Sequence, residues 1–180
     1  EDPNTARLGE SFYAYAVRAW GGSFKAGLEI ETALLRQRDG AVRWWRHPYS
    51  LYLGGAALVF ICAAVIGGFG GVLALLGLAM YAQMQLLLSD YVQHYGLVRQ
   101  VMPNGKPAPV AARHSWNAPH WFSSALMLNA PRHSDHHAHP GKRYPGLILP
   151  DVENAPMLPR SLPSMAVLAL SRRSILSVLR

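Results

Sequence analysis

The chain has 180 residues, of which 51% are hydrophobic and only 15% are charged, and its formal net charge is +7. Soluble domains carry about a quarter charged residues, so this composition argues against an ordinary water-soluble protein. The single cysteine, Cys62, excludes an internal disulfide, an iron–sulfur cluster and a zinc site held by several cysteines. Any metal site must therefore use histidine or carboxylate ligands.

The positive charge lies on both sides of one apolar block and is not interleaved with aromatic residues in a single basic stretch. The basic residues that flank the block are Arg36, Arg38, Arg43 and Arg46 before it, and Arg99, Lys106 and Arg113 after it. This distribution is typical of a membrane protein whose basic flanks face the cytoplasm. We therefore expect membrane lipid, and no nucleic acid, as the partner of this charge.

The N-terminal part of the chain predicts a long helix from Leu8 to about Arg38. Its apolar residues recur at helical spacing, and the aromatic residues near its start suit a helix at a membrane interface. The adjacent glycines Gly21 and Gly22 each cost roughly 1 kcal/mol relative to alanine in a helix. A kink or a break is therefore expected at this pair.

An apolar block of 38 residues without a charge, 51–88, follows the aromatic and basic segment RWWRHPYS. One membrane span needs about 20 apolar residues, so the block predicts a hairpin of two spans. We expect the spans at about 50–67 and 71–94, separated by the segment GGFGG. Because both flanks are basic, both ends of the hairpin should lie on the cytoplasmic side.

The region after the spans, 95–147, predicts a cytoplasmic segment. The pair Asn104-Gly105 between two extended runs predicts a small β-hairpin. A helix is expected from about Trp121 into a histidine-rich run, with its end at Pro140. The fold class is therefore mostly α: part of an integral membrane helical bundle, with interfacial and cytoplasmic helices. The tail 164–180 includes the apolar run MAVLAL, which is too short to span a membrane, and has no assigned structure.

Four of the eight histidines fall within seven positions. On a helix, His133, His136 and His137 share one edge, so their imidazole rings can converge. Neutral imidazoles donate lone pairs, and a cluster of them has few stable uses apart from metal binding. The alternative is a solvated histidine-rich loop, but the neighbouring membrane hairpin favours a metal site.

Two carboxylates and one more histidine have a place in this hypothesis. Asp90 and His94 lie four residues apart at the end of the second span and share a helix face. Ionisable residues in that position favour a functional role. Asp135, inside the histidine run, is expected to accept the second ring N–H of a ligand histidine.

The remaining histidines are weaker candidates. His114 and His120 each lie close to a tryptophan, and we expect them to support the site or to be structural. His47 and His139 are expected at the surface.

Four motifs together resemble the integral-membrane alkane 1-monooxygenases, which belong to a wider group of histidine-rich membrane hydroxylases and desaturases. The motifs are EDPNTARLGESF, DYVQHYGL, HSWN, and RHSDHH followed by KRY, in this order. The resemblance assigns residues 1–163 to the C-terminal part of such a domain. The family commonly has asparagine and glutamate where this chain has Asp90 and Gln93, and the ending after Met165 is unlike the family.

The resemblance implies a multi-pass protein of the cell inner membrane with a diiron centre, two irons per site, on the cytoplasmic side. Carried over by motif, the ligands are His94, His133, His136 and His137. Family members hydroxylate the terminal carbon of medium-chain n-alkanes with O2 and take electrons from rubredoxin. Two more histidine boxes precede the EDP segment in the family, so we expect this chain to be a C-terminal portion that is inactive alone.

Three functions are compatible with the sequence. The first is alkane hydroxylation by the whole protein. The second is the action of a related membrane diiron hydroxylase or desaturase on xylene-type or fatty acyl substrates. The third is a non-catalytic membrane protein whose histidine cluster binds a metal such as zinc. RHSDHH followed by KRY favours the first, and only the resemblance chooses iron, because imidazole binds iron and zinc.

Overall fold

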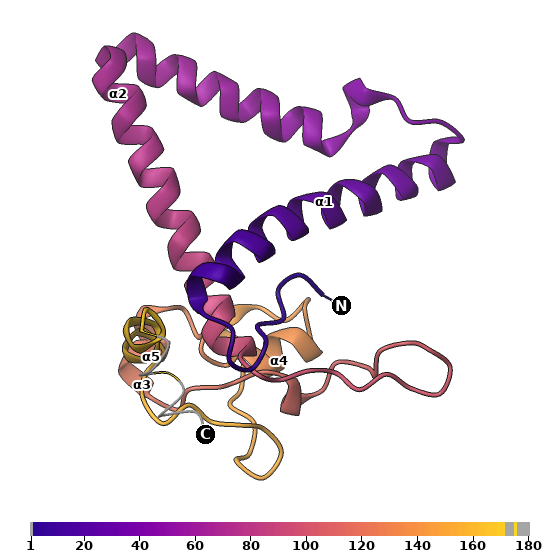
Figure 1. Ribbon diagram of the computed structural model, residues 1–180, viewed down its shortest axis with the longest axis vertical. Coiled ribbons are helices and arrows are strands. Elements are labelled where there is room, and N and C mark those ends of the chain that lie inside the picture. Colours follow the sequence, from indigo (N-terminus) through magenta and orange to yellow (C-terminus); the bar gives the residue numbers. More distant parts are fainter. Residues whose placement is uncertain (1, 172–174, 176–180) are drawn as a thin grey trace. The chain divides into compact units, whose positions relative to one another are not determined.

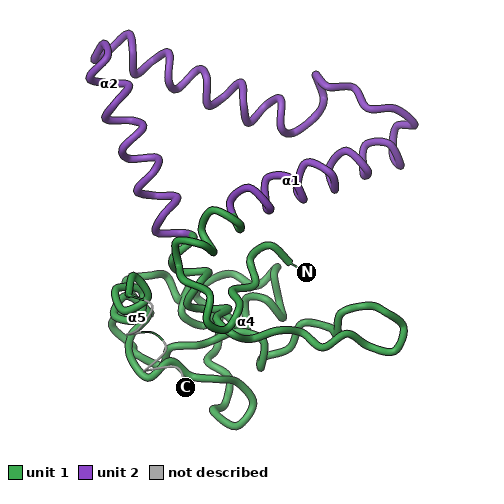
Figure 2. The backbone as a smooth tube through the Cα atoms, in the orientation of Figure 1, with its two compact units in different colours: residues 1–19, 87–180 green, residues 20–86 purple. Residues whose placement is uncertain are grey.

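The computed structural model describes residues 2–171 and 175, and this part of the chain is helical, as expected (Figure 1). The elements are α1 (Phe12–Asp39), η1 (Trp44–Arg46), α2 (Pro48–His94), η2 (Ala112–His114), α3 (Trp121–Leu126), α4 (His133–Ala138), η3 (Tyr144–Gly146) and α5 (Leu162–Ala169). The chain divides into two compact units (Figure 2). One contains residues 20–86, and the other contains residues 2–19 with the described part of 87–180.

α1 is one uninterrupted helix of 28 residues that runs through Gly21 and Gly22. The expected kink or break at this glycine pair is therefore wrong. Alanine, leucine, glutamate and lysine, which are strong helix formers, surround the pair and offset its cost. The helix ends before Gly40, whose φ of 71° places it in the left-handed conformation common after a helix C-terminus.

A buried corner connects α1 to α2 within residues 20–86. The ring of His47 is buried there, with Nε2 3.2 Å from Thr32 Oγ1 and Nδ1 accepting the N–H of Tyr49 at 3.2 Å. Trp44 stacks on the same ring, and the Tyr49 hydroxyl donates to the carbonyl of Phe24 at 3.0 Å. The expected surface position of His47 is wrong because both of its ring nitrogens find partners inside this corner.

α2 is the one helix in the described part of the chain that is long and apolar enough to cross a membrane. It has 47 residues, and the side chains of its apolar part are mostly exposed. A core helix of a soluble protein buries such side chains, because their transfer out of water drives folding. Exposure of this apolar surface therefore favours contact with lipid or with another apolar surface.

The segment GGFGG kinks α2, so that two helical stretches meet at Gly68. At Gly68 the backbone leaves the helical region, with φ 57° and ψ −146°, a conformation that is essentially restricted to glycine. A Cβ atom on Gly71 would collide with the carbonyl oxygen of Ala63. The expected hairpin of two separate spans is not supported, because one bent helix runs from Pro48 to His94 (Figure 1).

The segment 100–108 turns back on itself at Gly105 but forms no strands. One antiparallel bridge pairs Val101 with Pro107, and the backbone hydrogen bonds beside it are 2.8 Å long. Three prolines within 103–109 lack the N–H that a longer ladder would need. The expected β-hairpin is therefore not supported, and no β-strand occurs elsewhere in residues 2–171.

The helix expected from Trp121 through the histidine run is two short helices. α3 ends at Leu126, and the next residues include Leu128 and Asn129, both with positive φ. Pro131 then precedes α4, which contains the histidines. The helix is interrupted between α3 and α4 because neither a residue in the left-handed conformation nor a proline continues a helix.

α5 contains most of the run MAVLAL and is eight residues long, too short to span a membrane, as expected. α5 includes residues 164–169, which are the start of the tail 164–180. Residues 172–174 and 176–180 of that tail lie outside the described residues.

Candidate metal site

Three histidine side chains meet in the unit that contains residues 87–171. His94 comes from the C-terminal end of α2, and His133 and His137 come from α4. Nε2 of His133 lies 3.0 Å from Nε2 of His94 and 2.9 Å from Nε2 of His137. One ligand atom from each residue lies within 4.8 Å of the other two. The structure thus brings together three of the four histidines predicted as ligands, and we call them the histidine cluster.

The two short contacts of His133 are difficult to explain as hydrogen bonds alone. An imidazole nitrogen carries one hydrogen or one lone pair, so Nε2 of His133 can form one well-directed hydrogen bond. Three lone pairs directed at one ion would satisfy all three nitrogens. Nitrogens on adjacent corners of an octahedron, about 2.1 Å from an ion, lie about 3.0 Å apart. The distances from His133 to the two other donors therefore fit a shared metal ion, and the third pair lies within 4.8 Å.

The protonation states of two histidines in α4 also suit metal binding. Burial, followed by the charges of the neighbouring imidazoles, lowers the pKa of His133 to about 2. Burial and the charge of His136 lower the pKa of His137 as well, against a smaller opposing effect of Asp2. Both rings are neutral at physiological pH, and the neutral imidazole is the form that binds a metal.

Two polar side chains that were not among the predicted site residues fix both sides of the histidine cluster. Asn117 Oδ1 accepts the N–H of Ser134 at 3.0 Å, and Asn117 Nδ2 donates to Ser134 Oγ at 2.7 Å, which holds the first turn of α4. Gln93 is buried beside His94, and its Nε2 donates to the carbonyl of Ala130 at 3.0 Å. The end of α2 is thereby tied to the segment that leads into α4.

A cavity of about 260 Å³ borders the histidine cluster. Its ionisable and polar lining residues are Asp2, Asn4, Thr5, Asp90, His94, Arg99, His114, Ser115, His133, His136 and His137. The two carboxylates come from the N-terminal segment and from α2. Asp90 was predicted to take part in the site, whereas Asp2 was missed, although it belongs to the EDP motif.

The other predicted histidines differ in their positions. His136 is exposed, and its ring centroid lies 5.7 Å from that of His137 and 6.3 Å from that of His133, so it lines the cavity outside the histidine cluster. His114 is buried at the cavity wall, and its Nδ1 accepts the N–H of Ala111 at 3.0 Å. Burial lowers the pKa of His114, and nearby arginines lower it further. His120 is exposed at the start of α3 and does not line the cavity.

Among the described residues, the Asp135 carboxylate bonds to none of the four histidines predicted as ligands, and its expected role toward a ligand histidine stays a prediction. Its buried carboxylate accepts hydrogen bonds from Lys142 Nζ at 2.8 Å, from the N–H of Ile148 at 2.8 Å and from Nδ1 of His139 at 2.9 Å. Burial raises the pKa of Asp135, but these hydrogen bonds outweigh that effect and lower it to about 2. Asp135 therefore anchors the loop after α4, and His139 is exposed as expected.

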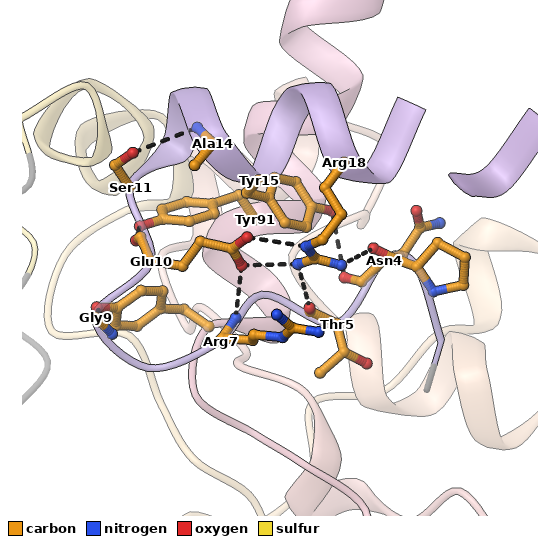
Figure 3. A network of polar contacts seen from close by, with 12 residues as sticks. Asn4, Thr5, Arg7, Gly9, Glu10, Ser11, Ala14, Tyr15, Arg18 and Tyr91 are labelled. Carbon is orange, nitrogen blue, oxygen red and sulfur yellow. Dashed lines mark hydrogen bonds and ion pairs between the residues drawn. The ribbon is translucent and has the colours of Figure 1, made fainter. Parts of the chain in front are cut away.

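The N-terminal segment reaches the cavity because a polar network holds it (Figure 3). The guanidinium of Arg18 donates to the Glu10 carboxylate at 2.9 and 2.7 Å and to the backbone carbonyls of Pro3 and Thr5, both at 2.9 Å. The phenol oxygens of three buried tyrosines, at positions 15, 91 and 95, hydrogen-bond the backbone of residues 4, 10 and 9, respectively. No sequence pattern pointed to Arg18 by itself.

Comparison with known proteins agrees with this arrangement. Residues 1–168 match the family model described as Fatty acid desaturase. The chain belongs to the fatty acid desaturase family. Within this family, it is 34% identical to Alkane 1-monooxygenase 1 of Alcanivorax borkumensis, over 93% of this chain and 41% of that protein.

Two further relatives extend the comparison within the desaturase family. The chain is 33% identical to Alkane 1-monooxygenase of Ectopseudomonas oleovorans, over 94% of this chain and 42% of that protein. It is 28% identical to the Xylene/toluene monooxygenase hydroxylase component XylM of Pseudomonas putida, over 76% of this chain and 36% of that protein. The resemblance drawn from the four motifs is confirmed. The chain spans 41% and 42% of the length of the two alkane 1-monooxygenases.

Proposed function

We propose that the whole protein that carries this chain is a membrane monooxygenase, and that it hydroxylates the terminal carbon of medium-chain n-alkanes with O2. The observation that carries this proposal is the histidine cluster at the end of α2, in a chain of the desaturase family. The relatives named above support the class of reaction, since two are named as alkane 1-monooxygenases and the third as a component of a xylene/toluene monooxygenase.

The metal in this proposal is iron, with two ions in the complete site. His94, His133 and His137 would hold one ion, and His136 would be a further ligand at the edge of the cavity. Bound iron would supply the redox chemistry that O2 requires. Zinc has no redox chemistry, so a monooxygenase reaction favours iron for the same imidazole donors.

The side chains around the cluster have two tasks in this reaction. Asn117 and Gln93 hold the ligand-bearing segments, so that the imidazole nitrogens stay in position. The carboxylates of Asp2 and Asp90 line the cavity, where they can exchange protons between solvent and the site. A monooxygenase places one oxygen atom of O2 in the product and reduces the other to water with two electrons and two protons, so the reaction requires a supply of protons.

The apolar surface of α2 suits a substrate without polar groups. An alkane must be bound by burial, at about 0.8 kcal/mol per CH2, so an eight-carbon chain gains several kcal/mol in an apolar channel. In the proposed topology α2 lies in the cell inner membrane, which the whole protein crosses several times, and the histidine cluster faces the cytoplasm. The basic flanks would attract an acidic electron donor, such as a rubredoxin, on that side.

The test compares the whole protein with two histidine variants, in membranes supplied with O2, rubredoxin and octane. We expect 1-octanol as the product and about two irons per protein. His133→Ala should remove more than one iron per protein and lower octanol formation at least about 100-fold, since it removes the central ligand of the histidine cluster. His120→Ala removes an exposed histidine outside the cavity and should change neither.

Other outcomes would support a different function. Oxidation of xylene or of a fatty acyl chain without octane hydroxylation would favour the second function, to which the similarity with the xylene/toluene component points. Zinc without iron, together with no oxygenase activity, would favour a non-catalytic metal-binding protein. Equal activity of His133→Ala and His120→Ala would contradict the role of the histidine cluster.

A further inference from the structure

A second cavity lies at the buried corner between the end of α1 and the start of α2. Its volume is about 480 Å³, which is within the usual range for small-ligand sites. It is lined by Glu31, Gln37 and Arg38 of α1, by Arg46 of η1 and by Pro48 of α2, together with two leucines of α1. All of these residues belong to the unit of residues 20–86, and none takes part in the histidine cluster.

Positive charge exceeds negative charge around this cavity. The segment 36–46 contains four arginines and one aspartate. Arg38 forms two hydrogen bonds with Asp39, at 2.8 and 3.1 Å. Among the described residues, the structure gives no ion pair to the other arginines, Arg36, Arg43 and Arg46. A guanidinium fork without a carboxylate partner is well suited to a phosphate group.

The backbone at Arg46 is fixed beside this cavity, since its N–H donates to the carbonyl of Arg43 at 2.9 Å. The next residue, His47, is buried and hydrogen-bonded to α1 through Thr32. Thr32 Oγ1 in turn donates to the carbonyl of Leu28 at 2.6 Å. Pro48, which begins α2, has no N–H, and the N–H groups of Tyr49 and Ser50 donate to Nδ1 and to the carbonyl of His47. The geometry therefore presents Arg46 to the cavity, beside the pair of Arg38 and Asp39.

The residues beside the cavity indicate its depth in a membrane. Trp44 and Trp45 are 57% and 79% exposed, and they immediately precede the helix that is apolar enough to cross a bilayer. Tryptophan side chains prefer the interface between headgroups and acyl chains. A cavity at this level faces phospholipid headgroups.

We propose that this cavity binds the headgroup of an anionic glycerophospholipid of the phosphatidylglycerol type. Arg46 binds the phosphate, Arg38 stays paired with Asp39, and Glu31 and Gln37 accept hydrogen bonds from the glycerol hydroxyls. The excess of arginine selects an anionic headgroup over a zwitterionic one. Bound lipid then fixes the corner at which α2 enters the bilayer. This inference depends on the membrane position of α2 and not on the chemistry of the histidine cluster.

The test measures lipid binding to the whole protein in detergent, by native mass spectrometry with phosphatidylglycerol and phosphatidylethanolamine. Salt at about 0.3 M shortens the Debye length to about 6 Å, so that only direct contacts of arginine remain strong. Arg46→Gln should weaken phosphatidylglycerol binding roughly ten-fold, the usual effect of losing a charge-assisted hydrogen bond. Arg36→Gln removes the same charge from the same segment but outside the cavity lining, and should change binding less than about two-fold.

A charge-preserving variant separates loss of contact from loss of folding. Arg46→Lys should bind phosphatidylglycerol more tightly than Arg46→Gln, because lysine keeps a positive charge for the phosphate. Equal effects of Arg46→Gln and Arg36→Gln would overturn the proposal and indicate a diffuse basic surface. Equal binding of phosphatidylethanolamine, or equal binding of the water-soluble headgroup glycerophosphoglycerol, would also overturn it.

Discussion

The Nε2 atoms of His94 and His133 lie 3.0 Å apart, although 39 positions separate the two residues in the chain. His94 is the last residue of α2, and His133 is the first residue of α4. An ion bound by both would therefore connect the end of the candidate membrane helix to the histidine-rich helix. A metal that binds only the folded state adds its binding free energy to the free energy of unfolding. Removal of the metal should therefore weaken the link between α2 and α4.

The position of His136 predicts that it serves a different ion from the histidine cluster. The centroid of the His136 ring lies 5.7 Å from that of His137 and 6.3 Å from that of His133, and its nitrogens are not among the three clustered donors. In the whole protein, His136→Ala should lower the metal content from about two ions to about one, because the histidine cluster keeps all three of its donors. Metal analysis of the purified protein measures this. An unchanged metal content would contradict a ligand role for His136.

His133→Ala is the matched variant for that experiment. It removes the nitrogen that lies within 3.0 Å of both other members of the cluster, so more metal should be lost than with His136→Ala. If the two variants lose the same amount of metal, the distinction between His136 and the histidine cluster is wrong.

The parts of the fold that were predictable depend on local pattern. An uncharged apolar run longer than 30 residues predicts a helix of membrane-spanning length, and the structure has α2 there. His133 and His137 are four residues apart, so any helix places them on one face, as α4 does. The spacing of His94 and Asp90 at the end of a span favoured a functional role, but only the family resemblance made His94 a ligand, because nothing local connects it to α4.

The parts that were not predictable depend on contacts between distant residues. His47 is buried because Thr32, 15 positions earlier, lies opposite its ring. Asp135 faces Lys142 and Ile148, and periodicity within α4 carries no information about that loop. The glycines of GGFGG were correctly identified as a change of direction, but composition alone does not distinguish a bend at Gly68 from a loop between two helices.

Arg18 should control how firmly the N-terminal segment is held against the cavity. Arg18→Met keeps the length of the side chain but removes the hydrogen bonds to Glu10, Pro3 and Thr5. We expect the free energy of unfolding to fall by about 2–3 kcal/mol, since the charged group that remains on Glu10 loses its partner. Hydrogen exchange of residues 2–10, followed by mass spectrometry, should become faster.

Arg38→Met is the control for this prediction. Arg38 also forms two hydrogen bonds with a carboxylate, but its side chain is 70% exposed. Its loss should change stability by no more than about 0.5 kcal/mol. If exchange in residues 2–10 is equally slow in Arg18→Met and in the unmodified protein, the network of Figure 3 does not hold the segment.

The ion pair between Arg18 and Glu10 predicts that the stability of the fold depends on pH in the acidic range. The hydrogen bond from Arg18 lowers the pKa of Glu10 below its ordinary value of 4.5, and burial opposes this only in part. A lowered folded-state pKa means that the carboxylate stabilises the fold above about pH 4.5, and that this contribution is lost as the pH falls through the folded-state pKa. The unmodified protein should therefore be more stable than Glu10→Gln at neutral pH, and the difference should shrink on acidification. Unfolding measured from pH 7 to pH 3 provides the check, and a difference that stays constant over this range would contradict the ion pair as its cause.

The bend of α2 makes Gly71 and Gly70 a matched pair, because the two are adjacent and the same substitution should affect them oppositely. A Cβ atom on Gly71 would collide with the backbone carbonyl of Ala63, whereas one on Gly70 would meet no atom within 4 Å. Gly71→Ala should therefore lower the free energy of unfolding by about 1–3 kcal/mol, as overpacking against a backbone atom does. Gly70→Ala should leave stability unchanged or raise it by up to about 1 kcal/mol, because alanine favours the helix.

Unfolding of the whole protein in lipid–detergent mixtures measures both variants. Equal stability of the two would mean that the segments on either side of Gly68 do not approach as closely as the structure shows, and that the bend does not need glycine at position 71.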